Sequence, residues 1–489
     1  MKKSFSFKTL FIALGTLAVP GAVSAASLLE VYQQALQSDP RIHEAEARRL
    51  ASLEAEPQAR GVLLPQLSLD GSWTRASSDG SGNFNQFLEV PPGSGNFEVV
   101  PLPFQSETRD NETASWQVSL RQTLFRWDQI VGLRRADKLV AKAEADREAA
   151  QQDLIVRVGQ NYFDVLAAED RLTSRHANRQ AIARQLEQAK QRFDVGLIAI
   201  TDVQESQAAY DQAVADEIAA KRSLASAREF LREITGEYVS NLSAPGDEFP
   251  MRTPNPNNES NWVDMALGQN LALTSSRLDE KLARDEISFR RNGYYPTIDL
   301  VANIGNNDSE SEQDTGAGFL PRESDFDFDS IGIQFSVPIF QGGSNTSRVR
   351  EAVYLHRAAR EQLQRVTRET ERATRDAYLG VLSEMSRVEA LKQAVESSRT
   401  ALEATEAGFD VGTRTIVDVL NSQFNLYSSI TLFYQARYDY LMNALRLKQA
   451  AGNLQIQDLE EIDRWLTERP TPEEAFAAEE TAAAGETSE

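Results

Sequence analysis

The stretch that decides the fold occurs twice, as FDVGLIAITDV at residues 193–203 and as FDVGTRTIVDV at residues 409–419. Seven of the eleven positions are identical at a spacing of 216 residues, so the molecule is a duplicated unit. Each copy lies between two long helical patterns, with Gly196 and Gly412 at the break. Because glycine adopts the left-handed conformation that ends many helices, we predict two helical hairpins with these residues at their tips.

Outward from the tips, each repeat contains two stretches that alternate between polar and apolar residues. They lie at residues 66–76, 114–125, 298–304 and 331–337. Such strands suit a half-buried soluble sheet or an outer-membrane barrel, and soluble sheets are far commoner. The polar loops predicted between the paired strands, at 77–113 and 306–328, shift the interpretation toward a membrane barrel, since such barrels carry long polar loops at one end.

Four strands cannot close a barrel, and an open sheet edge does not survive in lipid. We therefore expect several protomers to contribute strands. The helical patterns near 127–193 and 344–408 each cover roughly 65 residues, or a rod of about 100 Å. Helices of that length reach across a compartment.

Composition excludes several classes of function. The first 25 residues have a lysine-rich start and an apolar run, which predicts a secretory signal peptide. Its removal takes the net charge from −22 to about −25, which disfavours a nucleic-acid partner. The chain has no cysteine and only three isolated histidines, so we expect no disulfide, no metal site and no cysteine nucleophile. After the signal, no run of about 18 apolar residues predicts a spanning helix.

Four segments together resemble the TolC family of outer-membrane efflux and secretion channels. They are VYQQA at 31–35, VGLIAITDV at 195–203, VGTRTIVDVL at 411–420 and ARYDYL at 436–441. The missing cysteine places the chain with the members that lack a lipid anchor. The resemblance implies a homotrimer with a twelve-stranded β-barrel that is continuous with a periplasmic α-helical barrel. It implies no catalysis and no cofactor.

The expected organisation combines the patterns with this resemblance. It comprises a signal peptide (1–25), periplasmic helices (26–62), an outer-membrane β-hairpin (63–126) with an extracellular loop (77–113), a long helical hairpin (127–235) with its tip at 194–202, an equatorial linker (236–261), further periplasmic helices (262–293), a second β-hairpin (294–341) with a loop (306–328), a second long hairpin (342–452) with its tip at 409–418, and a C-terminal equatorial helix followed by an acidic disordered tail (453–489).

The function so implied is an exit duct of the Gram-negative outer membrane, integral to it and with a large periplasmic extension. It would carry drugs or secreted proteins passively in tripartite efflux or type I secretion systems. Its partners would be further copies of itself in a homotrimer, a periplasmic adaptor, an inner-membrane transporter of the RND, ABC or MFS type, and outer-membrane lipid. The alternative is a periplasmic adaptor, which also uses helical hairpins but needs only one hairpin and lipoyl-like β domains.

The aspartates at the tips have two interpretations. Asp202 and Asp418 lie in the first turn of the returning helices. A carboxylate there can cap the helix and interacts favourably with the positive end of the helix dipole. In a symmetric ring the same residue would instead attract cations. The resemblance assigns a gating and selectivity ring to Asp418, and its second acidic ring position falls on Asn421. This chain would then have one acidic ring where the family has two. We therefore expect its cation selectivity, and its block by multivalent cations, to be weaker than in family members with two acidic rings.

The resemblance also assigns a latch that holds the tips closed. Arg414, which is otherwise a solvated surface residue, would bond toward Thr201 and Asp202 of a neighbouring hairpin. Phe409 stands where the family has a tyrosine, so one closing hydrogen bond would be missing. A further polar link falls on two residues, Gln185 and Glu406. The adaptor would contact the tips themselves, at Val195, Gly196, Leu197, Val411, Gly412 and Thr413.

Overall fold

The computed structural model describes residues 25–239, 241–246, 249–314 and 319–476, so the predicted signal peptide lies outside the described residues apart from Ala25. The chain divides into two compact units. Unit 1 comprises Met1–Ala45, Glu148–Leu271 and Arg368–Glu489, and unit 2 comprises Glu46–Arg147 and Ala272–Thr367. Each unit therefore takes segments from both repeats.

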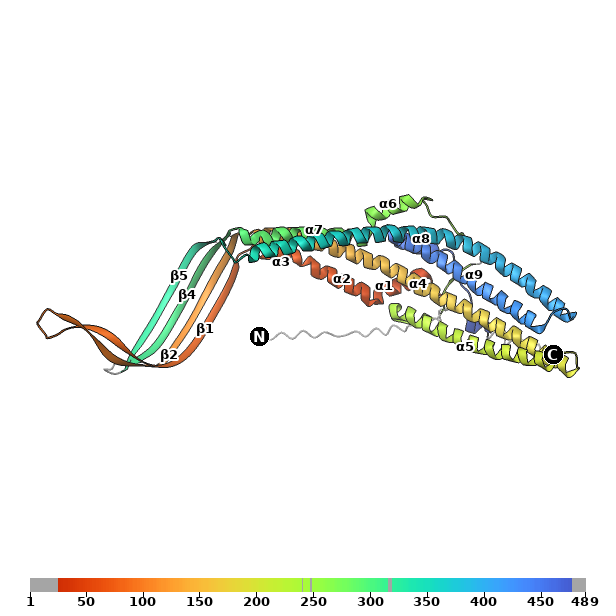
Figure 1. The fold of residues 1–489 in the computed structure, drawn as a ribbon, viewed down its shortest axis with the longest axis horizontal. Helices are drawn as coiled ribbons and strands as arrows, with labels where there is room; N and C mark the ends of the chain where they lie inside the picture. Colours follow the sequence, from red (N-terminus) through yellow and green to blue (C-terminus); the bar gives the residue numbers. More distant parts are fainter. Residues whose placement is uncertain (1–24, 240, 247–248, 315–318, 477–489) are drawn as a thin grey trace, which may run out of the picture. The chain divides into compact units, whose positions relative to one another are not determined.

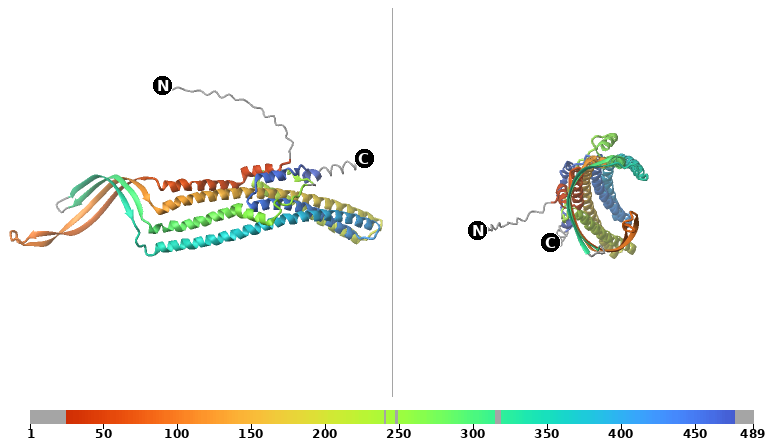
Figure 2. Two further views of the ribbon diagram at one scale, coloured as in Figure 1. Left: turned by 90° about the horizontal axis from the view of Figure 1, so that it is seen from above. Right: turned by 90° about the vertical axis from the view of Figure 1, so that its left-hand side faces the viewer.

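Unit 2 contains a four-stranded antiparallel sheet with the strand order β1-β2-β4-β5 (Figure 1, Figure 2). The strands are β1 (Gln66–Glu89), β2 (Phe97–Phe125), β4 (Thr297–Asp314) and β5 (Phe319–Ser336). Strands β2 and β4 come from different repeats and place Val118 opposite Ile304. The two repeats therefore meet at the centre of the sheet, and β1 and β5 form its edges.

The strands are longer than the sequence predicts. Pairing of β1 with β2 continues to Glu89 opposite Phe97, through most of the predicted loop 77–113. Pairing of β4 with β5 likewise continues through the predicted loop 306–328, and residues 315–318 lie outside the described part. The predicted bounds of the two loops were too wide because they followed side-chain alternation. Strand pairing is made by backbone hydrogen bonds, which polar and glycine-rich segments form as well.

The helices of unit 2 are joined by ion pairs. Unit 2 contains α3 (Ala55–Gly61), most of α7 (Leu271–Arg290) and the first parts of α4 (Trp127–Asp194) and α8 (Ser344–Asp410). Three ion pairs connect α4 to α7, namely Arg135 with Glu286 at 2.6 Å, Lys138 with Asp285, and Lys142 with Asp279 at 3.5 Å. These side chains are partly exposed, so the ion pairs contribute little to the free energy of folding. Their main effect is to determine which faces of α4 and α7 pack together.

Unit 1 is helical. Besides the later parts of α4 and α8, it contains α1 (Leu28–Ser38), the start of α2 (Pro40–Leu53), α5 (Ile200–Thr235), α6 (Glu259–Gln269), α9 (Ile416–Ala451) and α10 (Ile456–Asp463). A two-stranded ribbon pairs β3 (Ala244–Pro245) with β6 (Leu466–Thr467). Neither α4 nor α8 contains a proline, and helices of this length are stabilised mainly by packing of their apolar positions.

The core of unit 1 connects α4 to α9 and to the chain ends. Tyr162 and Phe163 of α4 are almost fully buried, and the ring of Phe163 stacks on that of Tyr438 with centroids 5.7 Å apart. The Tyr162 hydroxyl donates to the carbonyl of Ser243 at 2.6 Å. Burial raises the pKa of Tyr162 well above its usual value, so its hydroxyl remains a donor.

The C-terminal segment is ordered further than the sequence predicts. The acidic composition predicts disorder from Thr471, but residues 472–476 form a helical turn against unit 1. Glu473 pairs with Arg228 at 3.0 Å, and the ring of Phe476 stacks on His176 with centroids 3.7 Å apart. The prediction rested on the average composition of the tail, which does not reveal the contacts of two individual side chains, Glu473 and Phe476. Residues 477–489 lie outside the described part.

Within the described ranges, no helix combines the length and the apolar character needed to cross a membrane.

Candidate functional site at the hairpin tips

Both hairpins of unit 1 turn through the same backbone geometry. Gly196 and Gly412 each have φ of 78°, in the left-handed region that favours glycine. The N–H of Leu197 donates to the carbonyl of Arg192 at 2.9 Å, and the N–H of Thr413 donates to that of Gly408 at 2.8 Å. These bonds define the Schellman ending of α4 and α8. The two tips therefore have equivalent backbones and differ in their side chains.

The two tip aspartates have different surroundings. Thr415 caps α9, and Asp418 accepts from the N–H of Thr415 at 2.9 Å and from its hydroxyl at 3.0 Å. These bonds, and the nearby charge of Arg414, lower the pKa of Asp418 below its ordinary value. The equivalent cap of α5 is Ala199, which has no side-chain acceptor, so Asp202 lies in a first turn without a capping box. Side-chain capping therefore applies to Asp418 alone.

Asn421 lies three residues after Asp418, and its side chain is exposed while that of Asp418 is partly exposed. Residues three apart on a helix are neighbours on one face. The predicted ring positions therefore lie side by side on α9, with one carboxylate between them.

Arg414 is exposed at the second tip, and its side-chain stem lies over Gly408. A Cβ atom built on Gly408 would stand 2.8 Å from Cγ of Arg414. In the described part of the chain, the guanidinium makes no hydrogen bond or ion pair, so the structure of one chain does not bring it to Thr201 or Asp202. The sequence analysis did not single out Gly408. Its lack of a side chain leaves room for the stem of Arg414, and the sequence alone does not show that the two residues are close.

Gln185 and Glu406 are not joined within the chain either. Oε1 of Gln185 is buried without a hydrogen-bond partner among the described residues, whereas Glu406 is partly exposed. Burial and then the charge of Glu406 contribute to a raised pKa of Tyr427 on α9. Both residues of the predicted link lie on the long helices of unit 1, Gln185 on α4 and Glu406 on α8.

An ion pair that sequence reasoning missed joins the two tips. Nη2 of Arg192, in the last turn of α4, lies 2.6 Å from Oδ1 of Asp410, in the last turn of α8. The guanidinium carbon of Arg192 also lies 4.8 Å from the ring centre of Phe409. The two tips carry exposed apolar side chains as well, at Val195, Leu197 and Val411, with Thr413 exposed beside them.

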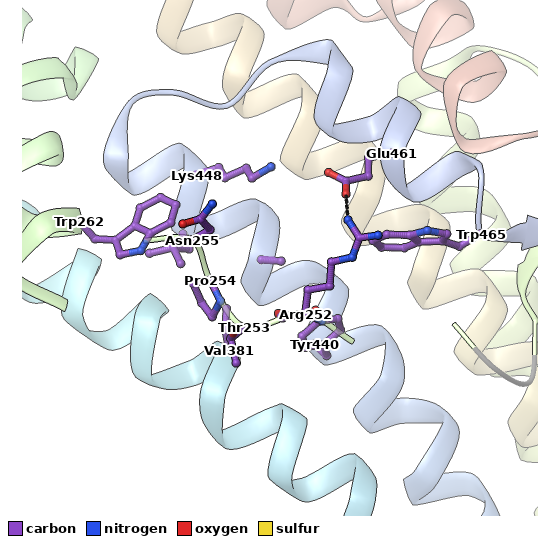
Figure 3. A pocket seen from close by; sticks show the side chains of 12 residues that line it. Arg252, Thr253, Pro254, Asn255, Trp262, Val381, Tyr440, Lys448, Glu461 and Trp465 are labelled. Carbon is purple, nitrogen blue, oxygen red and sulfur yellow. Dashed lines mark hydrogen bonds and ion pairs between the residues drawn. The ribbon is translucent and has the colours of Figure 1, made fainter. Parts of the chain in front are cut away.

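A cavity of about 450 Å³ lies in unit 1 between residues 252–255 of the linker and helix α9 (Figure 3). Its two cationic side chains are each paired, Arg252 with Glu461 at 3.2 Å and Lys448 with Asp458 at 2.5 Å. The hydroxyl of Tyr440 also accepts from the N–H of Arg252 at 2.8 Å. The two contacts of Arg252 hold the linker against α9 and α10, and the pair of Lys448 with Asp458 joins α9 to α10. Among the described residues, no group of three or more His, Asp or Glu side chains could hold a metal ion.

The sheet of unit 2 presents an exposed apolar face at every second position. On β5 the exposed side chains are Ile331, Ile333 and Phe335, and Ile331 is 78% exposed. On β1 the alternating exposed residues are Leu67, Leu69 and Trp73. Apolar residues on one face of a sheet, with polar residues between them, are typical of strands that face lipid. This exposed apolar face and the long helical hairpins point to a class of membrane protein with helical extensions.

Comparison with known proteins identifies the family. Residues 31–237 and 262–453 match the family described as outer membrane efflux protein, so the chain belongs to that family. It is 37% identical to the outer membrane protein TolC of Vibrio cholerae serotype O1 over 456 residues, which cover 93% of this chain and 96% of that protein. It is 36% identical to TolC of Escherichia coli K12 over 447 residues, with 91% and 85% covered.

A more distant relative is the alkaline protease secretion protein AprF of Pseudomonas aeruginosa, with 29% identity and 92% and 89% of the two chains covered. Among solved structures, VceC of Vibrio cholerae aligns with a TM-score of 0.67 and 19% identity over 87% of this chain and 96% of its own. CmeC of Campylobacter jejuni aligns with a TM-score of 0.67 and 15% identity, with 96% and 98% covered. At these identities the structures establish the fold.

The predicted family, localisation and general function are thereby confirmed. The chain is an outer-membrane efflux or secretion channel of the TolC family with a large periplasmic helical part. The mixed helical and sheet fold agrees with the solved channels. The matched relatives do not support the alternative of a periplasmic adaptor.

Proposed function

We propose that this chain is the passive exit duct of tripartite drug-efflux or type I protein secretion systems, and that it works as a homotrimer. The observation that carries the proposal is the sheet of unit 2, which has an exposed apolar face and two edge strands, β1 and β5. Unpaired backbone groups at a sheet edge are not tolerated in hydrocarbon. Further copies of the chain must therefore pair with these edges.

Three copies supply twelve strands, which is the number that resemblance to the family favours over two copies. In this assembly β1 of one protomer pairs with β5 of the next, and the apolar faces of the sheets contact outer-membrane lipid. The long helices of three protomers would form a periplasmic barrel. Cargo would then pass through the assembly without a catalytic step.

The gate of the proposed duct lies at the hairpin tips. One copy of Asp418 from each protomer would form an acidic ring, with Asn421 as a neutral ring one turn away. Arg414, which is unpaired among the described residues of one chain, has the exposure and the donors to bond Thr201 and Asp202 of an adjacent protomer. The Nε2 group of Gln185 would donate to the carboxylate of Glu406 in a further link.

The proposed partners are a periplasmic adaptor and an inner-membrane transporter of the RND, ABC or MFS type. The AprF relative, named for protease secretion, favours a secretion role as well as drug efflux. The exposed apolar side chains of Val195, Leu197 and Val411 at the tips are the surface on which an adaptor would dock. The transported substrate would be selected by the pump.

Cysteine cross-linking tests the assembly, because the natural chain contains no cysteine. One cysteine in β1, at Ser68, is combined with single cysteines scanned along β5. These strands are opposite edges of one sheet, so a disulfide would join different chains. We expect oxidised ladders that end at three chains. Cysteines in β5 combined with Ser119→Cys in β2 serve as the control. Ladders that end at two chains, or no cross-link at any position, would contradict the trimer.

A further inference from the structure

The ion pair between Arg192 and Asp410 joins the two repeats at their tips. The two residues lie 218 positions apart, and they come from the last turns of α4 and α8. They do not occupy equivalent positions in the repeat, since Gly408 corresponds to Arg192 and Asp194 corresponds to Asp410. The contact is therefore not a consequence of the duplication and needs its own explanation.

Arg192 has three roles at the first tip. Its carbonyl accepts the N–H of Leu197, which closes the end of α4. Its guanidinium binds the carboxylate of Asp410 and lies over the ring of Phe409, 4.8 Å from the ring centre. A guanidinium that contacts both a carboxylate and an aromatic ring is held in one orientation. The side chain therefore reaches from one hairpin to the other.

A small apolar cluster near the first tip lies within one hairpin. The small apolar cluster of Leu186, Ala189 and Val203 joins α4 to α5 and contains no residue of α8 or α9. Among the described residues beyond position 186 of α4, the ion pair that connects the two hairpins is that of Arg192 with Asp410. Arg192 therefore connects the hairpins at this level through its ion pair with Asp410 and its contact with the ring of Phe409.

The exposure of the pair suits a link that must break. Arg192 is 31% exposed and Asp410 is 65% exposed, so water and salt screen their attraction. A strong buried pair would hold the tips shut permanently, whereas a weak pair shifts an equilibrium by a small factor. Phe409 occupies the position at which the family's tyrosine would supply a hydroxyl, and here its ring supports Arg192 instead.

We propose that Arg192 and Asp410 form a second latch of the gate, which holds the two hairpins of one protomer together in the closed channel. This latch rests on the proposed function of a duct gated at its tips. It differs from the Arg414 latch because both of its residues belong to the same protomer. Arg192 is a positioning residue that acts on the gate through the position of α8.

Single-channel recording of the purified full-length channel in planar bilayers tests the latch. Arg192→Gln and Asp410→Asn should each raise the conductance or the open probability, by about fivefold for a link of this strength. The double variant should exceed neither single variant, since both remove the same link. The swapped pair, Arg192→Asp with Asp410→Arg, should restore the closed behaviour. Raising the salt concentration should shrink the difference from the natural channel.

Arg399→Gln is the matched control, because it breaks an exposed pair with Glu396 on the same helix α8, at 3.2 Å. It should leave the currents unchanged. Equal currents in the natural protein and in both single variants, or no rescue in the swapped pair, would overturn the latch. Arg414→Ser, measured alongside, separates the two claims. If it opens the channel while the Arg192 variants do not, the gated duct stands and the second latch is wrong. If the folded natural protein forms no channel, both are wrong.

Discussion

Thr415 donates both its backbone N–H and its hydroxyl to the carboxylate of Asp418, at 2.9 and 3.0 Å, and its own hydroxyl oxygen accepts the N–H of Asp418 at 3.3 Å. The carboxylate at the proposed ring is thus held at the start of α9 and stays ionised to lower pH than an unbonded aspartate. The cap and the ring are compatible uses of one side chain. The bonds with Thr415 hold the carboxylate of Asp418 in place, and its position at the hairpin tip would expose it to the ions that enter the duct.

Loss of the cap should loosen the first turn of α9. Thr415→Val removes the hydroxyl, so the pKa of Asp418 should rise toward its ordinary value and the amides of residues 416–419 should exchange about fivefold faster. Hydrogen exchange followed by mass spectrometry measures this. Thr415→Ser keeps the hydroxyl and should behave as the natural protein does. Unchanged exchange in Thr415→Val would show that the capping box contributes nothing to the turn.

Gly408→Ala should open the channel as Arg414→Ser does. The added methyl group would stand 2.8 Å from Cγ of Arg414 and must displace it, although the backbone at Gly408 tolerates alanine. Gly132→Ala is the control, since a Cβ there meets no atom within 4 Å and alanine favours the helix. Single-channel recording compares the two. Equal currents in both variants would mean that the position of Arg414 does not govern the closed state.

Tyr438→Phe should destabilise unit 1. The hydroxyl of Tyr438 donates to Oδ2 of the buried Asp170 at 2.5 Å, and Arg469 binds the other oxygen at 2.6 Å. Removal of the hydroxyl leaves a buried carboxylate one partner short, at a cost of about 2 kcal/mol. Denaturant unfolding in detergent, followed by circular dichroism, measures the loss. Tyr354→Phe changes an exposed ring of α8 and should cost nothing measurable. A similar midpoint for both variants would contradict the assigned role of Tyr438.

Glu217 should make the protein sensitive to acid. Burial alone would raise its pKa, but hydrogen bonds from Lys221 and His176 and the charge of Arg179 outweigh burial and lower the pKa to about 2. The folded pKa lies below the unfolded value of 4.5, so the stability that Glu217 contributes is complete above pH 4.5 and is lost as the pH falls toward 2. Thermal unfolding between these pH values measures it.

In Glu217→Gln that part of the pH dependence should disappear, because no carboxylate is left to protonate. Glu205→Gln, at an exposed position of α5, should retain the slope of the natural protein. A natural protein whose melting temperature is flat between pH 4.5 and 2 would contradict the ion cluster around Glu217.

Asn421→Asp should increase cation selectivity. The substitution places a second carboxylate on the same face of α9, three residues from Asp418, so each protomer would add another negative charge to the ring. Reversal potentials in a salt gradient, and the concentration of a trivalent cation that halves the current, measure the effect. The reverse change, Asp418→Asn, should reduce both. If Asn421→Asp leaves the reversal potential unchanged, Asn421 does not face the ion path.

Much of the tip could be predicted from the sequence. Gly196 and Gly412 mark the turns because a positive φ is a local demand that glycine meets, and the repeat shows it twice. The family segments likewise fixed Arg414 and Asp418 as candidates. Both inferences depend on short stretches of adjacent residues, which sequence patterns record well.

The Arg192–Asp410 pair could not be found in this way. Comparison of the repeats aligns Arg192 with Gly408, so it gives no reason to connect Arg192 with the other hairpin. The ends of β1 and β2 were missed for a related reason, since backbone pairing leaves no trace in side-chain polarity. Contacts between distant segments depend on packing, which a single sequence does not reveal.

Single-channel recording of the purified protein and of Arg414→Ser in planar bilayers tests the central claim, that the chain is a duct closed at its tips. We predict small cation-selective currents for the natural protein and larger currents for the variant. The absence of any channel, from protein shown by circular dichroism to be folded, would contradict the claim.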